Sequence, residues 1–218
     1  MSRDKCCRPF KPAQHPTFAQ ILIMRNLVTF AALAVLLTAS CNSQEETTTS
    51  ETAETSNNTP APAPQSSLGE QGTQKLMAVV SDYYSLKDAL VATNAQQADE
   101  AAVKFMSEVS NMKSYLSTDS ASGQALMPYL DTLSMGSKQI ILVKDETTEQ
   151  KRIHFEKVSD AMFGMLRAAD LKNAGVYRQY CPMAFNDKGA YWLSDVTDIK
   201  NPYFGKKMLE CGEVTDSL

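Results

Sequence analysis

The chain has 218 residues, of which 43% are hydrophobic and 8% aromatic, and its formal net charge is −4 at pH 7. Five of the 21 basic residues and one of the 25 acidic residues precede Cys41, which leaves 16 basic and 24 acidic residues from there onward, a net charge of −8. A nucleic-acid partner requires a basic face. The acidic balance therefore argues against nucleic-acid binding.

Residues 1–40 have the pattern of a targeting leader. Met24-Arg25-Asn26 precedes an apolar run over residues 27–37, and Thr38-Ala39-Ser40-Cys41 follows it. This arrangement resembles the bacterial lipobox, whose cysteine is lipidated and becomes the new N-terminus. The run is shorter than the roughly 20 residues of a membrane-spanning helix. We therefore predict a signal peptide that starts at Met24, and a lipid anchor on Cys41.

A lipid anchor would place the protein in the cell envelope. We expect an outer-membrane lipoprotein that faces either the periplasm or the surface. A start at Met24 removes Cys6 and Cys7, and lipidation uses Cys41, so that Cys181 and Cys211 remain as the side-chain thiols. An export compartment is oxidising, which favours a disulfide between two cysteines unless they bind a metal or are kept reduced.

The segment 41–72 is rich in Thr, Ser, Glu, Pro and Gln and has almost no apolar residue. Such a segment buries too little surface to offset its ordering entropy. We therefore predict a disordered linker from the lipidated cysteine to one folded domain over residues 73–218.

Four stretches of this domain place apolar residues at helical spacing. The first stretch follows a Thr73 cap, and the second follows an Asn94 cap. The third begins near Pro128, which suits only a first turn, and the fourth begins beyond Asp145. Their apolar positions are Leu76, Val79, Tyr83, Leu86 and Leu90; Ala98, Ala101, Phe105, Val109, Met112 and Leu116; Leu130, Leu133, Ile140 and Ile141; and Ile153, Phe155, Val158, Met162 and Leu166. This pattern predicts a mainly α fold, an antiparallel four-helix up-and-down bundle.

After Gly175 the helical pattern ends, and residues with β propensity, glycines, prolines and aromatics follow. We expect short strands or ordered loops near 176–181, 190–193 and 207–211, packed on the bundle. The aromatic residues Tyr191-Trp192 and Tyr203-Phe204 would attach this tail to the helices. If part of this aromatic surface is exposed, it would instead be a docking patch for a partner.

The tail contains two motifs with soft donors, Cys181-Pro182-Met183 and Met208-Leu209-Glu210-Cys211. Thiolate and thioether sulfur select Cu(I), whereas Mg and Ca prefer oxygen and zinc does not favour Met. The motifs therefore predict a Cu(I) site with these four residues as ligands. His154 lies on the fourth predicted helix, where it is either an auxiliary ligand or a packing residue. Met162 and Met165 on that helix are interpreted as core residues.

Longer motifs in the same tail resemble a known family. They are CPMA at 181–184, KGAYWLS at 188–194 and IKNPYFGKKMLECG at 199–212, together with YSLKDAL at 84–90 and RIHF at 152–155. They resemble an uncharacterised bacterial domain that occurs in small exported proteins and fused to the C-terminus of copper/silver efflux adaptor proteins of the CusB type. The resemblance implies a connection with copper, and a copper/silver efflux adaptor as a partner.

The alternative to a metal site is structural. Cys181 and Cys211 would form a loop-closing disulfide, and Met183 and Met208 would pack in the core. The protein would then be an interaction module whose stapled tail docks on an envelope complex without metal.

An enzymatic function has little support in the sequence. There is no G-x-S-x-G nucleophile elbow and no glycine-rich phosphate loop, and Cys181-Pro182-Met183 lacks the second thiol of a C-x-x-C redox motif. We therefore predict a protein without catalytic activity.

Overall fold

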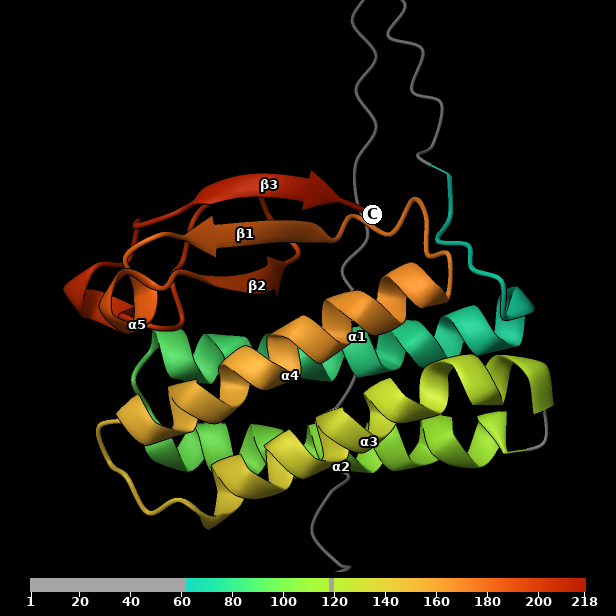
Figure 1. The fold of residues 1–218 in the computed structure, drawn as a ribbon, viewed down its shortest axis with the longest axis horizontal. Coiled ribbons are helices and arrows are strands. Elements are labelled where there is room, and N and C mark those ends of the chain that lie inside the picture. The colour runs from blue at the N-terminus through green and yellow to red at the C-terminus, as the bar shows by residue number, and fades with distance from the viewer. Residues whose placement is uncertain (1–61, 118–119) are drawn as a thin grey trace, which may run out of the picture. The chain divides into compact units, whose positions relative to one another are not determined.

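The computed structural model describes residues 62–117 and 120–218, which form a helical bundle followed by a small antiparallel sheet (Figure 1). Consecutive helices pack against each other along the chain. The four long helices are α1 (Gly69–Val91), α2 (Ala95–Leu116), α3 (Ser120–Leu142) and α4 (Glu149–Ala168). The prediction of a mainly α domain is confirmed. Cys41 and the predicted leader lie outside the described residues.

Helix α1 starts earlier than predicted. Its N-cap is Leu68 rather than Thr73, so the predicted cap is wrong. The Thr73 hydroxyl lies inside the helix, where it donates to the Gly69 carbonyl (2.7 Å) and bonds the Ser66 hydroxyl (2.8 Å). The preceding residues are also ordered, because the Ser67 N–H donates to the carbonyl of Ala169 at the end of α4. The last part of the predicted linker therefore belongs to the fold.

Helix α2 begins as predicted. Asn94 is its N-cap, and the side-chain oxygen of Asn94 accepts a hydrogen bond from the Gln97 N–H (3.0 Å). This bond satisfies one of the N–H groups that have no partner inside the first turn. The apolar spacing of α1 and α2 is confirmed, because its positions are at most 7% exposed.

Helix α3 differs from the prediction at Pro128, which lies inside the helix rather than in its first turn. Proline lacks the N–H that would donate to the carbonyl four residues earlier, here Gln124. Both Pro128 and Gln124 are exposed, so the missing hydrogen bond lies on the exposed side of the helix. The buried residues Leu126, Leu130 and Leu133 hold the helix in place on its other side.

Helix α4 buries two cations where an apolar residue was expected. Lys151 is 1% and Arg152 4% exposed, whereas Ile153, predicted to be in the core, is 39% exposed. The other predicted core positions, Phe155, Val158, Met162 and Leu166, are buried, and so is Met165. The predicted helical period is therefore confirmed, but the predicted inward face of the first turn is wrong.

The C-terminal sheet has the strand order β2-β1-β3. Strands β1 (Tyr177–Cys181) and β2 (Ala190–Ser194) match the first two predicted strands. Residues 207–211 form an ordered turn, the second of the two predicted alternatives, after a 3₁₀ turn over 205–207, and the third strand, β3, spans Glu213–Ser217. A short helical segment, α5 (Ala184–Asp187), follows β1 and lies at one end of the bundle (Figure 1).

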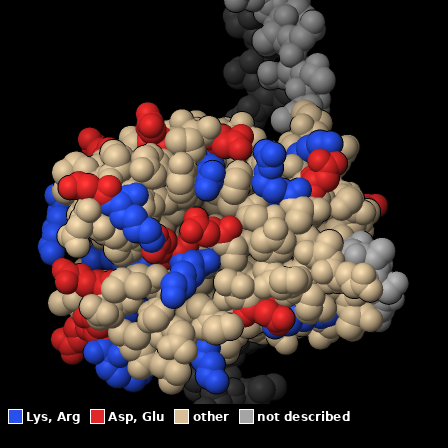
Figure 2. Space-filling model, viewed as in Figure 1, with Lys and Arg blue, Asp and Glu red and all other residues tan. Residues whose placement is uncertain are grey.

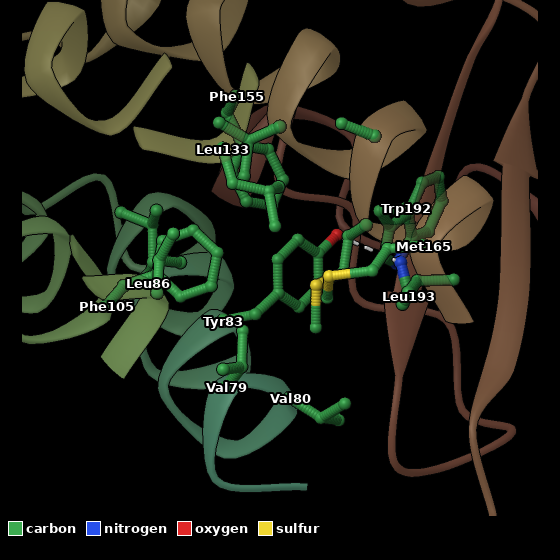
Figure 3. Close-up of a cluster of buried hydrophobic side chains, with 14 of the residues drawn as sticks. Val79, Val80, Tyr83, Leu86, Phe105, Leu133, Phe155, Met165, Trp192 and Leu193 are labelled. Atoms are coloured by element: carbon green, nitrogen blue, oxygen red, sulfur yellow. Dashed lines mark hydrogen bonds between the residues drawn. The ribbon is translucent and has the colours of Figure 1, made fainter. Parts of the chain in front are cut away.

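The buried Tyr83 hydroxyl connects the bundle to the sheet. It forms a hydrogen bond with the Ser159 hydroxyl of α4 (2.8 Å) and accepts one from the Leu193 N–H of β2 (3.0 Å). Figure 3 shows the hydroxyl pointing to the Leu193 nitrogen, between the bundle core and Trp192. The Tyr83 ring stacks on Phe155 with 5.3 Å between centroids. One side chain therefore sets where α4 and β2 lie relative to α1.

Lys151 joins the start of α4 to α2 and α3. Its ammonium donates to a carboxylate oxygen of Asp99 (2.6 Å) and to the carbonyls of Ile140 (2.7 Å) and Val143 (2.6 Å). The last carbonyls of a helix have no partner inside it and carry partial negative charge. The lysine therefore satisfies the end of α3 with two of its three donors and binds Asp99 of α2 with the third.

Arg152 joins the same turn to α1 and to the tail. Its guanidinium donates to the carbonyls of Pro202 (2.7 Å) and Leu90 (3.0 Å) and to the Thr93 hydroxyl (3.0 Å). Figure 1 shows that α1 and α3 end, and α4 begins, at the end of the bundle where α5 lies. The two adjacent cations therefore hold the ends of α1 and α3, the start of α4 and the tail together through hydrogen bonds.

The surface view in Figure 2 shows acidic and basic side chains interspersed over the face that is seen. Among the residues described, none of the helices has the length and apolar character to cross a membrane.

We predict that Lys151→Met lowers the free energy of unfolding by about 3 to 5 kcal/mol, because it leaves Asp99 and the last carbonyls of α3 without their cation. Urea denaturation measures the change. Lys157→Met, an exposed lysine on the same helix, is the matched control and should change stability by at most about 0.5 kcal/mol. Equal effects of the two substitutions would contradict the role of Lys151.

We predict that Tyr83→Phe costs about 1 to 3 kcal/mol, because the buried Leu193 N–H loses its acceptor. Tyr84 is the matched control, since its hydroxyl is buried without a hydrogen-bond partner in the described part of the chain. Tyr84→Phe should leave stability unchanged or raise it. A larger loss for Tyr84→Phe than for Tyr83→Phe would refute this account of the junction.

Candidate functional site

The structure brings the two predicted thiols into contact. The Sγ atoms of Cys181 and Cys211 are 2.7 Å apart, and both cysteines are free. Cys181 is fully buried, whereas Cys211 is partly exposed. Residues that lie 30 positions apart in the sequence therefore form one thiol pair.

Cys181 is placed by the sheet. It is the last residue of β1 and lies opposite Ala190 of β2. Neighbouring side chains of a strand point to opposite faces, so the burial of Gln179 and Cys181 identifies the inward face of β1. The Gln179 amide donates to the carbonyls of Val196 (2.9 Å) and Asp198 (3.2 Å). These bonds hold the loop after β2 against the strand that carries Cys181.

Cys211 is placed by the loop between β2 and β3. Its N–H donates to the Met208 carbonyl (3.3 Å), so the M-x-x-C motif is a closed turn. Buried Asn201 donates from its amide to the Cys211 carbonyl (2.8 Å) and accepts from the Tyr203 N–H (2.8 Å). The turn and this asparagine fix the backbone on both sides of the thiol.

Gly212 allows close packing next to Cys211. Its φ of 149° lies outside the region that residues with a side chain favour, and a Cβ there would meet the Trp192 ring at 2.8 Å. Trp192 is the only tryptophan of the chain and is fully buried. The indole ring therefore lies beside the residue that follows the Cys211 thiol.

The contact between the thiols changes their acidity. The hydrogen bond with Cys181, followed by burial, raises the pKa of Cys211 to about 11, although a backbone hydrogen bond from Met183 opposes the shift. This hydrogen bond places the backbone of Met183, the last residue of the Cys181-Pro182-Met183 motif, next to the Cys211 sulfur. At neutral pH the reduced Cys211 is a thiol rather than a thiolate.

Met183 and Met208 line one hollow of about 580 Å³, which we name the methionine hollow. Met183 is 47% exposed and Met208 is partly exposed. The remaining apolar lining consists of Ile153, Phe185, Tyr203 and Phe204. The two predicted thioether ligands therefore share a solvent-accessible space, while Cys181 and Cys211 do not line it.

The wall of the methionine hollow contains strained backbone. Phe185 (φ 52°), Asn186 (φ 58°) and Asp187 (φ 64°) are three successive residues in the left-handed region. Such conformations cost free energy, persist only where their surroundings enforce them, and cluster at ligand-binding sites. The Phe185 ring packs against Tyr203 with 5.2 Å between centroids, which helps to hold the segment.

Charged groups of both signs surround the methionine hollow. Glu149 and Asp187 line it, and Lys207 pairs with Glu149 across 3.1 Å. The Arg152 guanidinium also lines it, but its charge is directed to the carbonyls that bind it. Burial lowers the pKa of Arg152. Asp187 is thus the lining carboxylate without a salt bridge in the described part of the chain.

His154 is not brought to the methionine hollow, although its neighbours Arg152 and Ile153 line it. Val158, one turn later, packs against Gly136 of α3, where a Cβ would meet it at 2.5 Å and the His154 carbonyl at 3.6 Å. This part of α4 therefore faces α3 and not the tail. Burial, followed by the charge of Lys157, lowers the pKa of His154.

Two features of the site were missed in the sequence. Asn201 precedes Pro202, and the Asn-Pro pair is a turn signal that could have indicated its role in shaping the loop. The left-handed run over 185–187 had a weaker signal, the Asn-Asp pair before Lys188-Gly189, because these two residues tolerate positive φ. Phe185 itself gave no indication of its conformation.

The chemistry of the sulfur pair has two possible outcomes. Two thiolates on one ion with metal–sulfur bonds of about 2.3 Å lie about 3.7 Å apart, whereas a disulfide needs about 2.05 Å. The observed 2.7 Å lies between these values. A metal requires the sulfurs to separate by about 1 Å, and a disulfide requires a smaller approach. Within the described part of the chain no cluster of three or more His, Cys, Asp or Glu residues is placed to hold a metal, a criterion that leaves methionine out.

The fold is that of a helical bundle with a small C-terminal antiparallel sheet. Comparison with protein families places a domain described as "Protein of unknown function (DUF3347)" over residues 79–174. This range contains the YSLKDAL and RIHF motifs and ends before Cys181. No curated protein and no solved structure matched the chain.

We predict that Cys211 of the reduced protein reacts slowly with iodoacetamide at pH 7. A pKa of about 11 leaves about 100-fold less reactive thiolate than a pKa of 9. The rate should rise until pH approaches 11, as measured by mass spectrometry of the peptide that carries Cys211. Cys181→Ala removes the hydrogen-bond partner and should move the midpoint of the profile to lower pH. An unchanged midpoint in that variant would rule out this cause.

Proposed function

We propose that this chain is an exported lipoprotein that binds a soft metal ion, Cu(I), and either buffers it or transfers it to an efflux system. One observation carries the proposal. The residues of the two sulfur motifs gather at one end of the tail, with Cys181 and Cys211 in contact and Met183 and Met208 lining one hollow. The strained wall of that hollow is further support.

The donor set favours Cu(I) over other ions. Thiolates and thioethers are soft ligands, which suit Cu(I), whereas zinc sites use Cys, His and carboxylate without Met. In the proposal Cys181 and Cys211 are thiolate ligands, and Met183 and Met208 are thioether ligands. His154 is an auxiliary donor that would have to reach the site from a position outside the hollow.

The rest of the chain would anchor and support this site. The proposal includes a lipid on Cys41, attachment to the outer membrane on the periplasmic or surface side, and a copper/silver efflux adaptor of the CusB type as the recipient of the metal. The four long helices would form an antiparallel up-and-down bundle that acts as a scaffold without catalytic activity. The buried cations Lys151 and Arg152 support this scaffold role, because they fix the end of the bundle next to the site.

A second candidate function is favoured by the distance between the sulfurs. At 2.7 Å the thiols need to approach by less than 1 Å to form a disulfide. An oxidising compartment would favour that reaction. The chain would then be an interaction module whose tail, stapled by Cys181–Cys211, docks on an envelope complex without metal.

Titration of the reduced protein with Cu(I), in competition with a chromogenic chelator, tests the proposal. We predict one Cu(I) per chain, an affinity loss of roughly 100-fold for Cys181→Ser and of roughly tenfold for Met208→Leu. Met135→Leu changes a 63% exposed methionine of α3 outside the hollow and should bind like the wild type.

Wild-type stoichiometry and affinity in Cys181→Ser and Met208→Leu would show that the metal site is wrong. A protein isolated from the envelope with a mass 2 Da below that of the reduced form, and without bound copper, would favour the disulfide-stapled module.

A further inference from the structure

We propose that Met183 and Met208 capture the metal ion first and that the Cys181–Cys211 pair receives it second, so that the methionines set the association rate and the cysteines the dissociation rate. This inference rests on the proposed function, to which it adds an order of ligand exchange.

The exposure of the four side chains gives the order. Met183 is 47% exposed, and Met208 lines the same open hollow. Cys211 is partly exposed but does not line the hollow, and Cys181 is fully buried. An ion that enters the methionine hollow from solvent therefore meets thioether sulfur before it meets the buried thiol.

The chemistry of the donors favours the same order. A thioether carries no proton, so it binds Cu(I) without releasing anything. The two thiols are hydrogen-bonded to each other across 2.7 Å, so they must separate and release protons before they bind the ion. The thioethers are therefore ready to bind in the metal-free state, and the thiols are not.

Short backbone connections link the capture residues to the thiols. The Met183 N–H hydrogen bonds to the Cys211 sulfur, and the Met208 carbonyl accepts from the Cys211 N–H at 3.3 Å. Backbone groups of both methionines thus contact Cys211, the more exposed of the two cysteines. Cys211 is the first thiol that the captured ion can reach.

Charge around the hollow is compatible with cation capture. Asp187 lines it without a salt bridge in the described residues, whereas Glu149 is paired with Lys207. The Arg152 cation is held by carbonyls of the surrounding chain. A carboxylate at the opening raises the local concentration of cations.

The transfer step balances without a redox partner. The bonds between Cu(I) and the Met183 and Met208 sulfurs break, and bonds to the Cys211 and Cys181 sulfurs form. Each thiol that becomes a ligand releases its proton to solvent. Copper remains Cu(I), and both cysteines keep their oxidation state.

Trp192 provides the readout. It is the only tryptophan, and its ring lies against Gly212, directly after Cys211. Stopped-flow fluorescence with the full chain, reduced and without oxygen, would follow Cu(I) supplied as its acetonitrile complex. A chelator chase would give the dissociation rate. The variants are Met183→Leu/Met208→Leu, Cys181→Ser and the control Met135→Leu.

We expect the double methionine variant to associate at least about tenfold more slowly with an unchanged dissociation rate. Cys181→Ser should associate at the wild-type rate and dissociate at least about 100-fold faster, and Met135→Leu should match the wild type in both rates.

An unchanged association rate in the double methionine variant would overturn the proposed order of binding. A variant that binds Cu(I) more weakly only because it dissociates faster would also overturn it. Wild-type protein that binds no Cu(I) would instead reject the proposed function itself. Circular dichroism of each variant separates these outcomes from misfolding.

Discussion

The fold depends on two adjacent cations buried in the first turn of α4. Burying a charge is costly unless other groups satisfy it, and the N-terminal end of a helix is an unfavourable place for a cation. Lys151 and Arg152 are tolerated because carbonyls at the ends of α3 and α1 accept hydrogen bonds from them at the same place. The buried cations need the carbonyls as acceptors, and the carbonyls need the cations as donors, since they lack partners within their own helices. These hydrogen bonds between cations and helix ends fix the end of the bundle next to the candidate site. Arg152 also binds the carbonyl of Pro202 and so connects the tail to that end.

Aromatic packing carries this order from the core to the site. Tyr83 stacks on Phe155, Phe155 contacts Tyr203, and Tyr203 contacts both Phe185 and Trp192. Phe185 forms the strained wall of the methionine hollow, and Trp192 lies beside the Cys211 turn. Aromatic pairs of this kind add to the stabilisation that area burial gives. Packing against the bundle therefore fixes the position of the thiols, although the matched family range, 79–174, contains neither cysteine.

The sulfur site balances two demands that a single geometry does not meet. A metal needs separated, deprotonated sulfurs, whereas a disulfide needs them closer together. Cys181 and Cys211 lie between these arrangements, and the neighbouring thioethers have no such constraint. In the proposed function, the methionine hollow would take up an ion, and the neighbouring pair of buried Cys181 and partly exposed Cys211 would hold it. The same pair, once oxidised, would keep the tail closed with little change in the backbone.

Local sequence patterns determined the helices and the first two strands, and they singled out the two sulfur motifs whose cysteines lie in contact. Helical spacing depends on a period that the chain carries by itself, and Asn94 caps its helix with an atom three residues away. Tertiary structure decided the rest. Lys151 and Arg152 are buried because the ends of other helices meet them, Pro128 is tolerated because its face is exposed, and β3 begins after Cys211 because β1 accepts residues 213–217 as its neighbour. The contact of the thiols, the separation of His154 from the methionine hollow and the left-handed wall depend on partners distant in sequence, which no local pattern contains.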